Sequence, residues 1–288
     1  MRVPPEVRAM LDALLPGVQQ ALGENLAGVY LRGSLALGDF DPLTSDLDFL
    51  AVTERPVTDS EFRSLADLHA QLAQSSNRYA RRLEGSYIPR AAVRRFPVGG
   101  RRHPTLGTDW AFGWGEHRDN WILELWTVRE RGVVLWGPDP RTLIAPISAD
   151  QLREAVRSEL TARLRDWAAQ PEGPEWLLPR FYQAFEVQTM CRALYTLAHG
   201  TLPTKPRAVA WALGILPEPW HTLVERTRAW HTEAIPDPTG LAEVLRFVRW
   251  AASDGEAAVI VPDPAAPPQS NGSGGGGSTV PASAQQRK

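Results

Sequence analysis

The segment GSLALGDFDPLTSDLDFLAV, residues 33–52, places two aspartates at the start of an apolar run. Side chains alternate along an extended strand, so Asp46 and Asp48 are expected on one face of it. The apolar residues expected on the opposite face, in the core, are Leu47, Phe49 and Ala51. Two carboxylates this close resist joint ionisation unless a cation lies between them. Mg²⁺ suits the pattern, because it binds one or two carboxylates together with substrate phosphates.

A glycine and a serine precede the aspartates and offer a place for phosphate. Residues 26–32, LAGVYLR, are short and apolar and predict a strand that ends at Gly33. Backbone N–H groups at such a turn can hold phosphate oxygens, and glycine lets a ligand approach closely. The Ser34 hydroxyl can donate one more hydrogen bond. Because Gly33-Ser34 ends one predicted strand and the aspartates open the neighbouring one, the combination indicates phosphoryl-transfer chemistry assisted by a metal.

The first half of the chain alternates helix and strand patterns, which predicts an α/β domain over residues 1–140. A helix is expected before residue 22, and Pro16 is expected to kink or split it. Thr58 and Glu61 have capping-box spacing and predict the start of another helix. Further strands are expected at 47–52, 82–88 and 133–136, and a further helix at 120–132. We expect a mixed sheet with flanking helices.

Strand patterns stop after Pro146, and the remainder predicts an all-α helical bundle over residues 146–255. The expected helices cover residues 150–169, 176–199, 205–214, 218–233 and 239–253. Residues 262–288 are rich in Pro, Gly and Ser and lack core-forming side chains, so we expect a disordered tail.

The bulk composition excludes several classes of protein. A net charge of -2 provides no basic field for nucleic acid. Cys191 is the single cysteine, which excludes an intrachain disulfide framework and a cysteine-based zinc site. Neither a membrane-spanning apolar run nor a signal-peptide pattern is present. We therefore expect a soluble cytoplasmic protein with no nucleic-acid or membrane partner. We also expect a monomer, and a small-molecule acceptor is implied only by the family resemblance described next.

The glycine–serine and Asp-x-Asp pattern resembles the nucleotidyltransferase superfamily. Within it, the chain looks like the streptomycin/spectinomycin adenylyltransferases, over roughly residues 20–255. Four further segments carry the resemblance. The third strand of the family resembles RRLEGSYI (81–88), and the loop that follows it resembles FGWGEHRDN (112–120). The closing helix–strand unit resembles RERGVVLWGPDP (129–140), and the C-terminal helix pair resembles RALYTLAHGTLPTKPRAVAWAL (192–213). The resemblance implies the nucleotidyltransferase fold, ATP as donor, and AMP transfer to a hydroxyl of an aminoglycoside or aminocyclitol antibiotic, which would confer resistance.

The resemblance also implies roles for individual residues. The metal ligands would be Asp46 and Asp48, and the triphosphate would be held by Gly33, Ser34 and Ser45. Glu84 would be the general base that takes the proton of the acceptor hydroxyl. Arg192 and Lys205 would reach the phosphates from the bundle. Candidates for the acceptor pocket, from their place in a glycine-flanked loop, are Trp110, Trp114 and His117.

Two departures from the family pattern disfavour streptomycin as the acceptor. His117 stands where the family has a tryptophan that stacks on streptomycin, and Ala210 stands where it has an aspartate. Other readings remain open: AMP transfer to a protein side chain, or a nucleotide-binding module without catalysis. The aspartates can also be ordinary turn residues. Glu84 can be a surface strand residue, and Arg192 and Lys205 can be surface cations.

Overall fold

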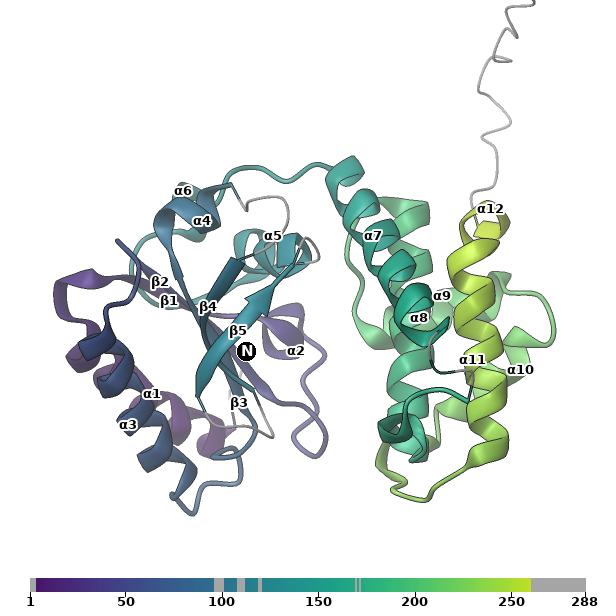
Figure 1. Cartoon of the computed structure of the whole chain (residues 1–288), viewed down its shortest axis with the longest axis horizontal. Helices are drawn as coiled ribbons and strands as arrows, with labels where there is room; N and C mark the ends of the chain where they lie inside the picture. The colour runs from purple at the N-terminus through teal and green to yellow at the C-terminus, as the bar shows by residue number, and fades with distance from the viewer. Residues whose placement is uncertain are drawn as a thin grey trace, which may run out of the picture.

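A sheet and a helical bundle lie side by side in the chain, as Figure 1 shows. The structure is a computed structural model, and it describes residues 4–95, 101–107, 112–118, 121–168, 170 and 172–259. The expected tail at 262–288 lies outside the described residues, and so does Trp110. We retain the division into domains at 1–140 and 146–255 as a proposal.

The described strands form one six-stranded sheet in the order β5-β4-β3-β2-β1-β6. They are β1 (Leu26–Leu31), β2 (Leu47–Thr53), β3 (Leu83–Pro89), β4 (Arg101–Leu106), β5 (Gly113–His117) and β6 (Val133–Trp136). Strands β2 and β3 run parallel, and every other neighbouring pair runs antiparallel. The sheet is therefore mixed and has flanking helices, which confirms the expected fold class.

Strand β2 lies near the centre of the sheet, and both faces of the sheet are buried there. Phe49 packs in the apolar core shared with α1 (Pro5–Leu22) and α3 (Asp59–Ala73). Leu50 points the other way, into a core shared with α5 (Trp121–Arg131). Both side chains are fully buried. The alternation expected for β2 is correct, and it puts Asp48 on the same face as Leu50.

Two sequence expectations in this half were wrong. The expected split at Pro16 is absent, because α1 is continuous and its buried stripe from Val7 to Leu22 packs along the whole length and offsets the hydrogen bond that Pro16 cannot make. A kink at Pro16 stays a prediction. The residues around Trp114 form strand β5 rather than a loop. Strands β4 and β5 escaped prediction because their arginines, proline and glycines have low strand propensity.

After β6, the regular elements of the described chain are all helices, joined by loops and one isolated bridge between Pro179 and Pro236. The main helices are α7 (Ala149–Ala168), α8 (Arg180–His199), α9 (Lys205–Ile215), α10 (Trp220–Thr227) and α11 (Pro238–Ser253). Helix α8 begins after Pro179, later than expected, because the prolines there interrupt the helical hydrogen bonds. The predicted helix at 218–233 is shorter, as α10 gives way to the 3₁₀ turn η3 (Trp230–Thr232).

Short elements complete the fold. These are α2 (Gly33–Leu37), α4 (Arg90–Arg94), α6 (Pro140–Leu143), α12 (Gly255–Val259), η1 (Gly23–Asn25) and η2 (Glu175–Leu177). In Figure 1, α2 and α5 lie on the side of the sheet that faces the bundle, and α1 and α3 cover the other side. None of the helices in the described ranges has both the length and the apolar character needed to cross a bilayer.

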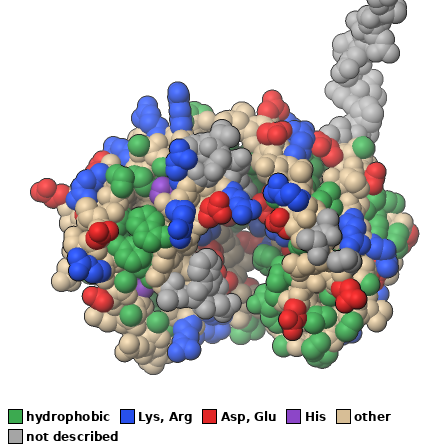
Figure 2. Space-filling view, viewed as in Figure 1, with side chains coloured by type: hydrophobic (Ala, Val, Ile, Leu, Met, Phe, Trp, Pro, Cys, Tyr) green, Lys and Arg blue, Asp and Glu red, His purple; other side chains and the backbone are tan. Residues whose placement is uncertain are grey.

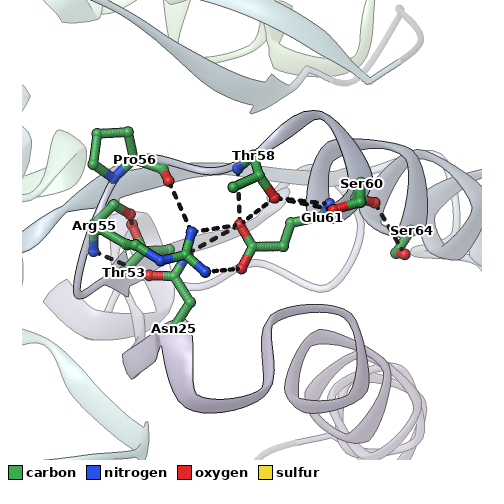
Figure 3. Close-up of polar contacts among 8 residues, drawn as sticks. All are labelled: Asn25, Thr53, Arg55, Pro56, Thr58, Ser60, Glu61 and Ser64. Carbon is green, nitrogen blue, oxygen red and sulfur yellow. Dashed lines mark hydrogen bonds and ion pairs between the residues drawn. The ribbon is translucent and has the colours of Figure 1, made fainter.

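A capping box fixes the start of α3, as the sequence predicts. The Thr58 side chain accepts a hydrogen bond from the backbone N–H of Glu61, and the Glu61 carboxylate accepts one from the backbone N–H of Thr58 at 2.8 Å. Figure 3 shows that Arg55 also pairs with Glu61, in a network that ties the end of β2 to α3. Burial of β2 and capping of α3 thus hold the strand that carries the two aspartates.

Thr58→Ala should lower the free energy of unfolding by about 1 kcal/mol, because it removes the side-chain oxygen that accepts from the backbone N–H of Glu61. Ser64→Ala, further along the exposed side of α3, should change it by less than about 0.5 kcal/mol. Denaturant unfolding of both variants measures the difference, and equal losses would show that the cap is not what stabilises this end of the helix.

Candidate active site

Asp46 and Asp48 lie where β2 begins, on either side of the fully buried Leu47. The backbone N–H of Leu47 donates to the carbonyl of Arg82 at 2.7 Å. The backbone N–H of Arg32 donates to the carbonyl of Asp48 at 2.9 Å. The ends of three strands are therefore joined at this point. The side chain of Asp48 is 16% exposed and that of Asp46 is 39% exposed.

Each aspartate has an arginine beside it. Nε of Arg82 lies 3.2 Å from Oδ1 of Asp46. A terminal nitrogen of Arg32 lies 3.4 Å from Oδ1 of Asp48 and 2.8 Å from the carboxylate of Glu124 on α5. The repulsion between the two aspartates is thus partly offset within the protein itself.

The site nevertheless disfavours ionised aspartates. The pKa of Asp48 is raised to about 6, chiefly by desolvation; Arg32 opposes this rise, and Glu124 and Glu84 add to it. Desolvation also raises the pKa of Asp46, with the charge of Asp48 adding to it and Arg82 opposing it. An additional cation would stabilise both carboxylates, and oxygen ligands of this kind suit a hard divalent ion. No group of three or more acidic, His or Cys side chains in the described ranges could hold a metal by itself.

The turn at Gly33 lies against the carboxylate of Asp48. Gly33 has φ +63°, in the left-handed region that favours glycine. A Cβ built at Gly33 would collide with Oδ2 and the carboxyl carbon of Asp48. The predicted phosphate turn and the predicted metal ligand are thus in direct contact, with no room for a side chain between them.

The two predicted serines differ in their surroundings. Ser34 opens α2 and its carbonyl accepts hydrogen bonds from the backbone N–H groups of Gly38 and Asp39, which close the turn. The hydroxyl of Ser45 accepts a hydrogen bond from the backbone N–H of Asp41 at 2.9 Å. Ser45 therefore shapes the loop before the aspartates, and its contact with a triphosphate remains a prediction.

Glu84 lies directly beside Asp48. The two residues are register partners in the parallel pair of β2 and β3, so their side chains share a face of the sheet. Glu84 is half-buried and interacts electrostatically with both Asp48 and Arg32. The structure thus brings the predicted base next to a predicted metal ligand.

The bundle presents Lys205 to this group of acids. The backbone N–H of Lys205 donates to the carboxylate of Asp39 at 3.1 Å. Burial and the charge of Arg192 lower the pKa of the Lys205 amine, whereas Asp39, Asp46 and Asp48 act to raise it. Lys205 and Arg192 are therefore close to one another, and Lys205 is within electrostatic reach of both aspartates. Figure 2 shows a hollow between the two parts of the molecule, with charged side chains beside it.

A cavity of about 280 Å³ adjoins Lys205 in the bundle. The described residues that line it are Gln188, Lys205, Pro206, Val209, Ala210, Leu213 and Arg228. This lining is apolar or cationic apart from one amide, and it contains no carboxylate.

Of the three predicted acceptor residues, Trp110 lies outside the described residues, and Trp114 and His117 lie apart. Trp114 is 44% exposed and stacks on Phe62 of α3, with ring centroids 5.5 Å apart, so it lies on the α1 and α3 side of the sheet. His117 is buried and its Nε2 lies 2.9 Å from the hydroxyl of Ser86, on the same face as Glu84. Desolvation lowers the pKa of His117 to about 4. The position of Trp114 speaks against a shared pocket, because the sheet separates its ring from Glu84.

Sequence reasoning missed Arg32, Arg82 and Glu124 as neighbours of the aspartates. One signal was available: Arg32 is a charged residue that ends an otherwise apolar strand directly before the phosphate turn. The pairing with Glu124 has no local signal, because α5 lies some ninety positions further along the chain.

Comparison with known proteins finds matches to two domain families. Residues 11–87 match the nucleotidyltransferase domain, and residues 142–253 match the C-terminal domain of aminoglycoside adenylyltransferases. Spectinomycin 9-adenylyltransferases of Staphylococcus aureus strains Mu50 and N315 are each 24% identical over 225 residues, which cover 73% of this chain and 80% of the relative. The crystal structure of a spectinomycin adenyltransferase from Enterococcus faecialis, determined with ATP and spectinomycin, superposes with a TM-score of 0.67 at 17% identity. That superposition covers 85% of this chain and 98% of the other.

The sheet, the glycine–serine turn and the matched domain define a nucleotidyltransferase, and the chain is an enzyme of that class. With the second matched domain, it is an aminoglycoside adenylyltransferase-like protein of the nucleotidyltransferase superfamily.

Gly33→Ala should reduce both folding stability and activity, since the new methyl group must displace the carboxylate of Asp48 and also adopt a left-handed backbone. Gly23→Ala is a matched control, because Gly23 also has positive φ but has nothing within 4 Å of a built Cβ. Both variants should lose about 1–2 kcal/mol of folding stability through strain, but only Gly33→Ala should lose activity. Activity at the wild-type level in Gly33→Ala would contradict the assigned contact.

Asp48→Asn should abolish transfer and stabilise the metal-free fold at neutral pH. The folded pKa of about 6 exceeds the ordinary value for aspartate, so ionisation of Asp48 costs stability as the pH rises through this range. The variant removes that cost, and its advantage in unfolding free energy should reach about 1–3 kcal/mol above pH 6 and vanish below about pH 4. Unfolding at several pH values measures it; an advantage that is independent of pH would contradict the assignment.

Proposed function

We propose that this chain transfers AMP from Mg²⁺-bound ATP to a hydroxyl group of an aminocyclitol antibiotic of the spectinomycin type and releases pyrophosphate. One observation carries the proposal: the Asp48 carboxylate lies against the Gly33 turn, with Glu84 beside it in the sheet and Lys205 within reach from the bundle. A metal-bound triphosphate and a base are the partners that this arrangement suits.

In the proposed reaction, Asp46 and Asp48 hold the ion, which when bound offsets negative charge on the phosphates. The turn at Gly33 and Ser34 orients the triphosphate, and Lys205 and Arg192 attract it from the opposite side. Positioning of this kind supplies much of the rate in phosphoryl transfer.

Glu84 removes the proton from the acceptor hydroxyl as its oxygen attacks the α-phosphorus. A bond forms between that oxygen and the phosphorus, and the bond from the α-phosphorus to the bridging oxygen breaks. Pyrophosphate leaves with the electron pair, and the proton remains on Glu84 until solvent accepts it. This side chain is half-buried at the face of the sheet that holds Asp48, where an acceptor and the α-phosphate could meet.

Three observations support the proposed acceptor. The names of the curated relatives and of the solved neighbour refer to spectinomycin. The cavity beside Lys205 has two cationic residues and no carboxylate in its described lining, which disfavours an acceptor that carries many positive charges. The buried His117 and the alanine at position 210 also leave streptomycin without the family contacts.

Purified protein with ATP, Mg²⁺ and a panel of spectinomycin, streptomycin and more highly charged aminoglycosides tests the proposal. Transfer of AMP to spectinomycin is expected, with pyrophosphate released and little transfer to the polycations. Chelation of the metal should stop the reaction. Radiolabel from ATP on the protein itself, rather than on a small molecule, would contradict the acceptor class.

Glu84→Gln should lower kcat by about 10²–10⁴-fold, because the amide cannot accept the proton. Glu116→Gln is the matched control: Glu116 lies on β5, is largely exposed and pairs with Arg118. Its kcat should stay within about twofold of wild type. Retention of full turnover in Glu84→Gln would show that another group is the base.

A further inference from the structure

The two predicted metal ligands share an arrangement that the proposed reaction does not explain. In each aspartate, Oδ1 is the oxygen closest to an arginine: 3.4 Å for Asp48 and Arg32, and 3.2 Å for Asp46 and Arg82. Oδ2 of Asp48 instead lies against the turn at Gly33. One oxygen of Asp48 thus faces a protein cation, and the other faces the predicted place of the phosphates.

Arg32 is fixed from several sides. Its side chain is 12% exposed, and its guanidinium pairs with Glu124 at 2.8 Å while it also contacts Asp48. The guanidinium lies over the ring of Trp121, 5.5 Å from the centroid. Its own backbone N–H donates to the carbonyl of Asp48. A group held in this way can set the orientation of the carboxylate beside it.

We propose that Arg32 is a positioning residue for Asp48: it occupies Oδ1 and thereby leaves Oδ2 alone to bind the divalent ion. The inference rests on the proposed function, because it takes Asp48 as a ligand of that ion. Arg82 has the equivalent relation to Asp46 at the more exposed side of the site.

The coordination chemistry of Mg²⁺ explains why pairing one oxygen of Asp48 with Arg32 would matter for catalysis. Mg²⁺ requires near-octahedral geometry with short bonds and retains several water ligands. A carboxylate that binds through both oxygens displaces a water and moves the ion, whereas a second partner on one oxygen prevents this. Displacement of the ion would misalign the phosphates, and misalignment of about 1 Å can lower a rate by about 10²-fold.

Because Glu124 also pairs with Arg32, Arg32 can orient Asp48 without cancelling the negative charge of the site. Arg32 is closer to Glu124 than to Asp48, so its charge is shared between two carboxylates. If Arg32 paired with Asp48 alone, it would compete with the ion for that carboxylate. The pair formed by Arg32 and Glu124 therefore orients Asp48 and leaves it negative enough to bind a cation.

Arg32→Met tests the proposal, with Mn²⁺ as the probe in the presence of a non-hydrolysable ATP analogue. Water-proton relaxation reports how many waters stay on the bound Mn²⁺, and the variant should lose about one, because both oxygens of Asp48 become available. At saturating Mn²⁺ and ATP, kcat should fall by about 10–100-fold. Arg55→Met, which removes an arginine from an ion pair at the other end of β2 (Figure 3), should change neither readout.

The outcomes separate the inference from the function on which it rests. If wild type binds Mn²⁺ and transfers AMP, and Arg32→Met has the same water count and kcat, the positioning role is wrong and the function stands. If wild type binds no Mn²⁺ with the nucleotide analogue, both are wrong. A change in kcat without a change in water count also overturns the inference.

Glu124→Gln keeps the proposal testable where Arg32→Met does not fold. The neutral amide leaves Arg32 to pair with Asp48 alone, so Mn²⁺ should bind about tenfold more weakly, while the bound Mn²⁺ keeps the wild-type number of waters because Arg32 still pairs with Oδ1 of Asp48. Unchanged affinity for Mn²⁺, or the loss of a water from the bound ion, would overturn the inference.

Discussion

The carboxylate of Asp48 rests on the backbone of Gly33, and the geometry of the site follows from this contact. It requires a residue without a side chain, with positive φ, directly after β1. It also requires β2 to begin beside that turn, which the hydrogen bond from the Arg32 N–H to the Asp48 carbonyl secures. Glu84 then takes its place through the register of β3 on β2. In the proposed reaction, the contact puts the metal next to the phosphates.

Electrostatic cost is the second constraint on this site. Desolvation and neighbouring acids make ionised Asp48 unfavourable, and Arg32 compensates only in part. Such a group is held in place by the packing around it, namely the buried faces of β2 and the two apolar cores. The ionised aspartates therefore lower the folding stability of the metal-free protein, and a bound cation would restore it. Lys205 contributes from the bundle, so the charges of the site come from both parts of the chain.

The sequence predicted the strands around the aspartates well, because apolar runs bounded by glycine or turn residues leave few alternatives. It predicted the adjacency of Gly33 and Asp48 from their positions at the ends of neighbouring strands. It failed for β5, whose glycines and Trp114 resemble a loop until the neighbouring strand pairs with them. It could not predict the pair formed by Arg32 and Glu124, because that contact depends on how α5 packs against α2.

The most direct measurement is a crystal structure of the protein with Mn²⁺ and a non-hydrolysable ATP analogue, with the ion located by its anomalous scattering. The account predicts one ion that contacts both Asp46 and Asp48 and a phosphate oxygen, with the triphosphate along the turn at Gly33 and Ser34. An ion or a triphosphate bound away from these two aspartates would contradict the account.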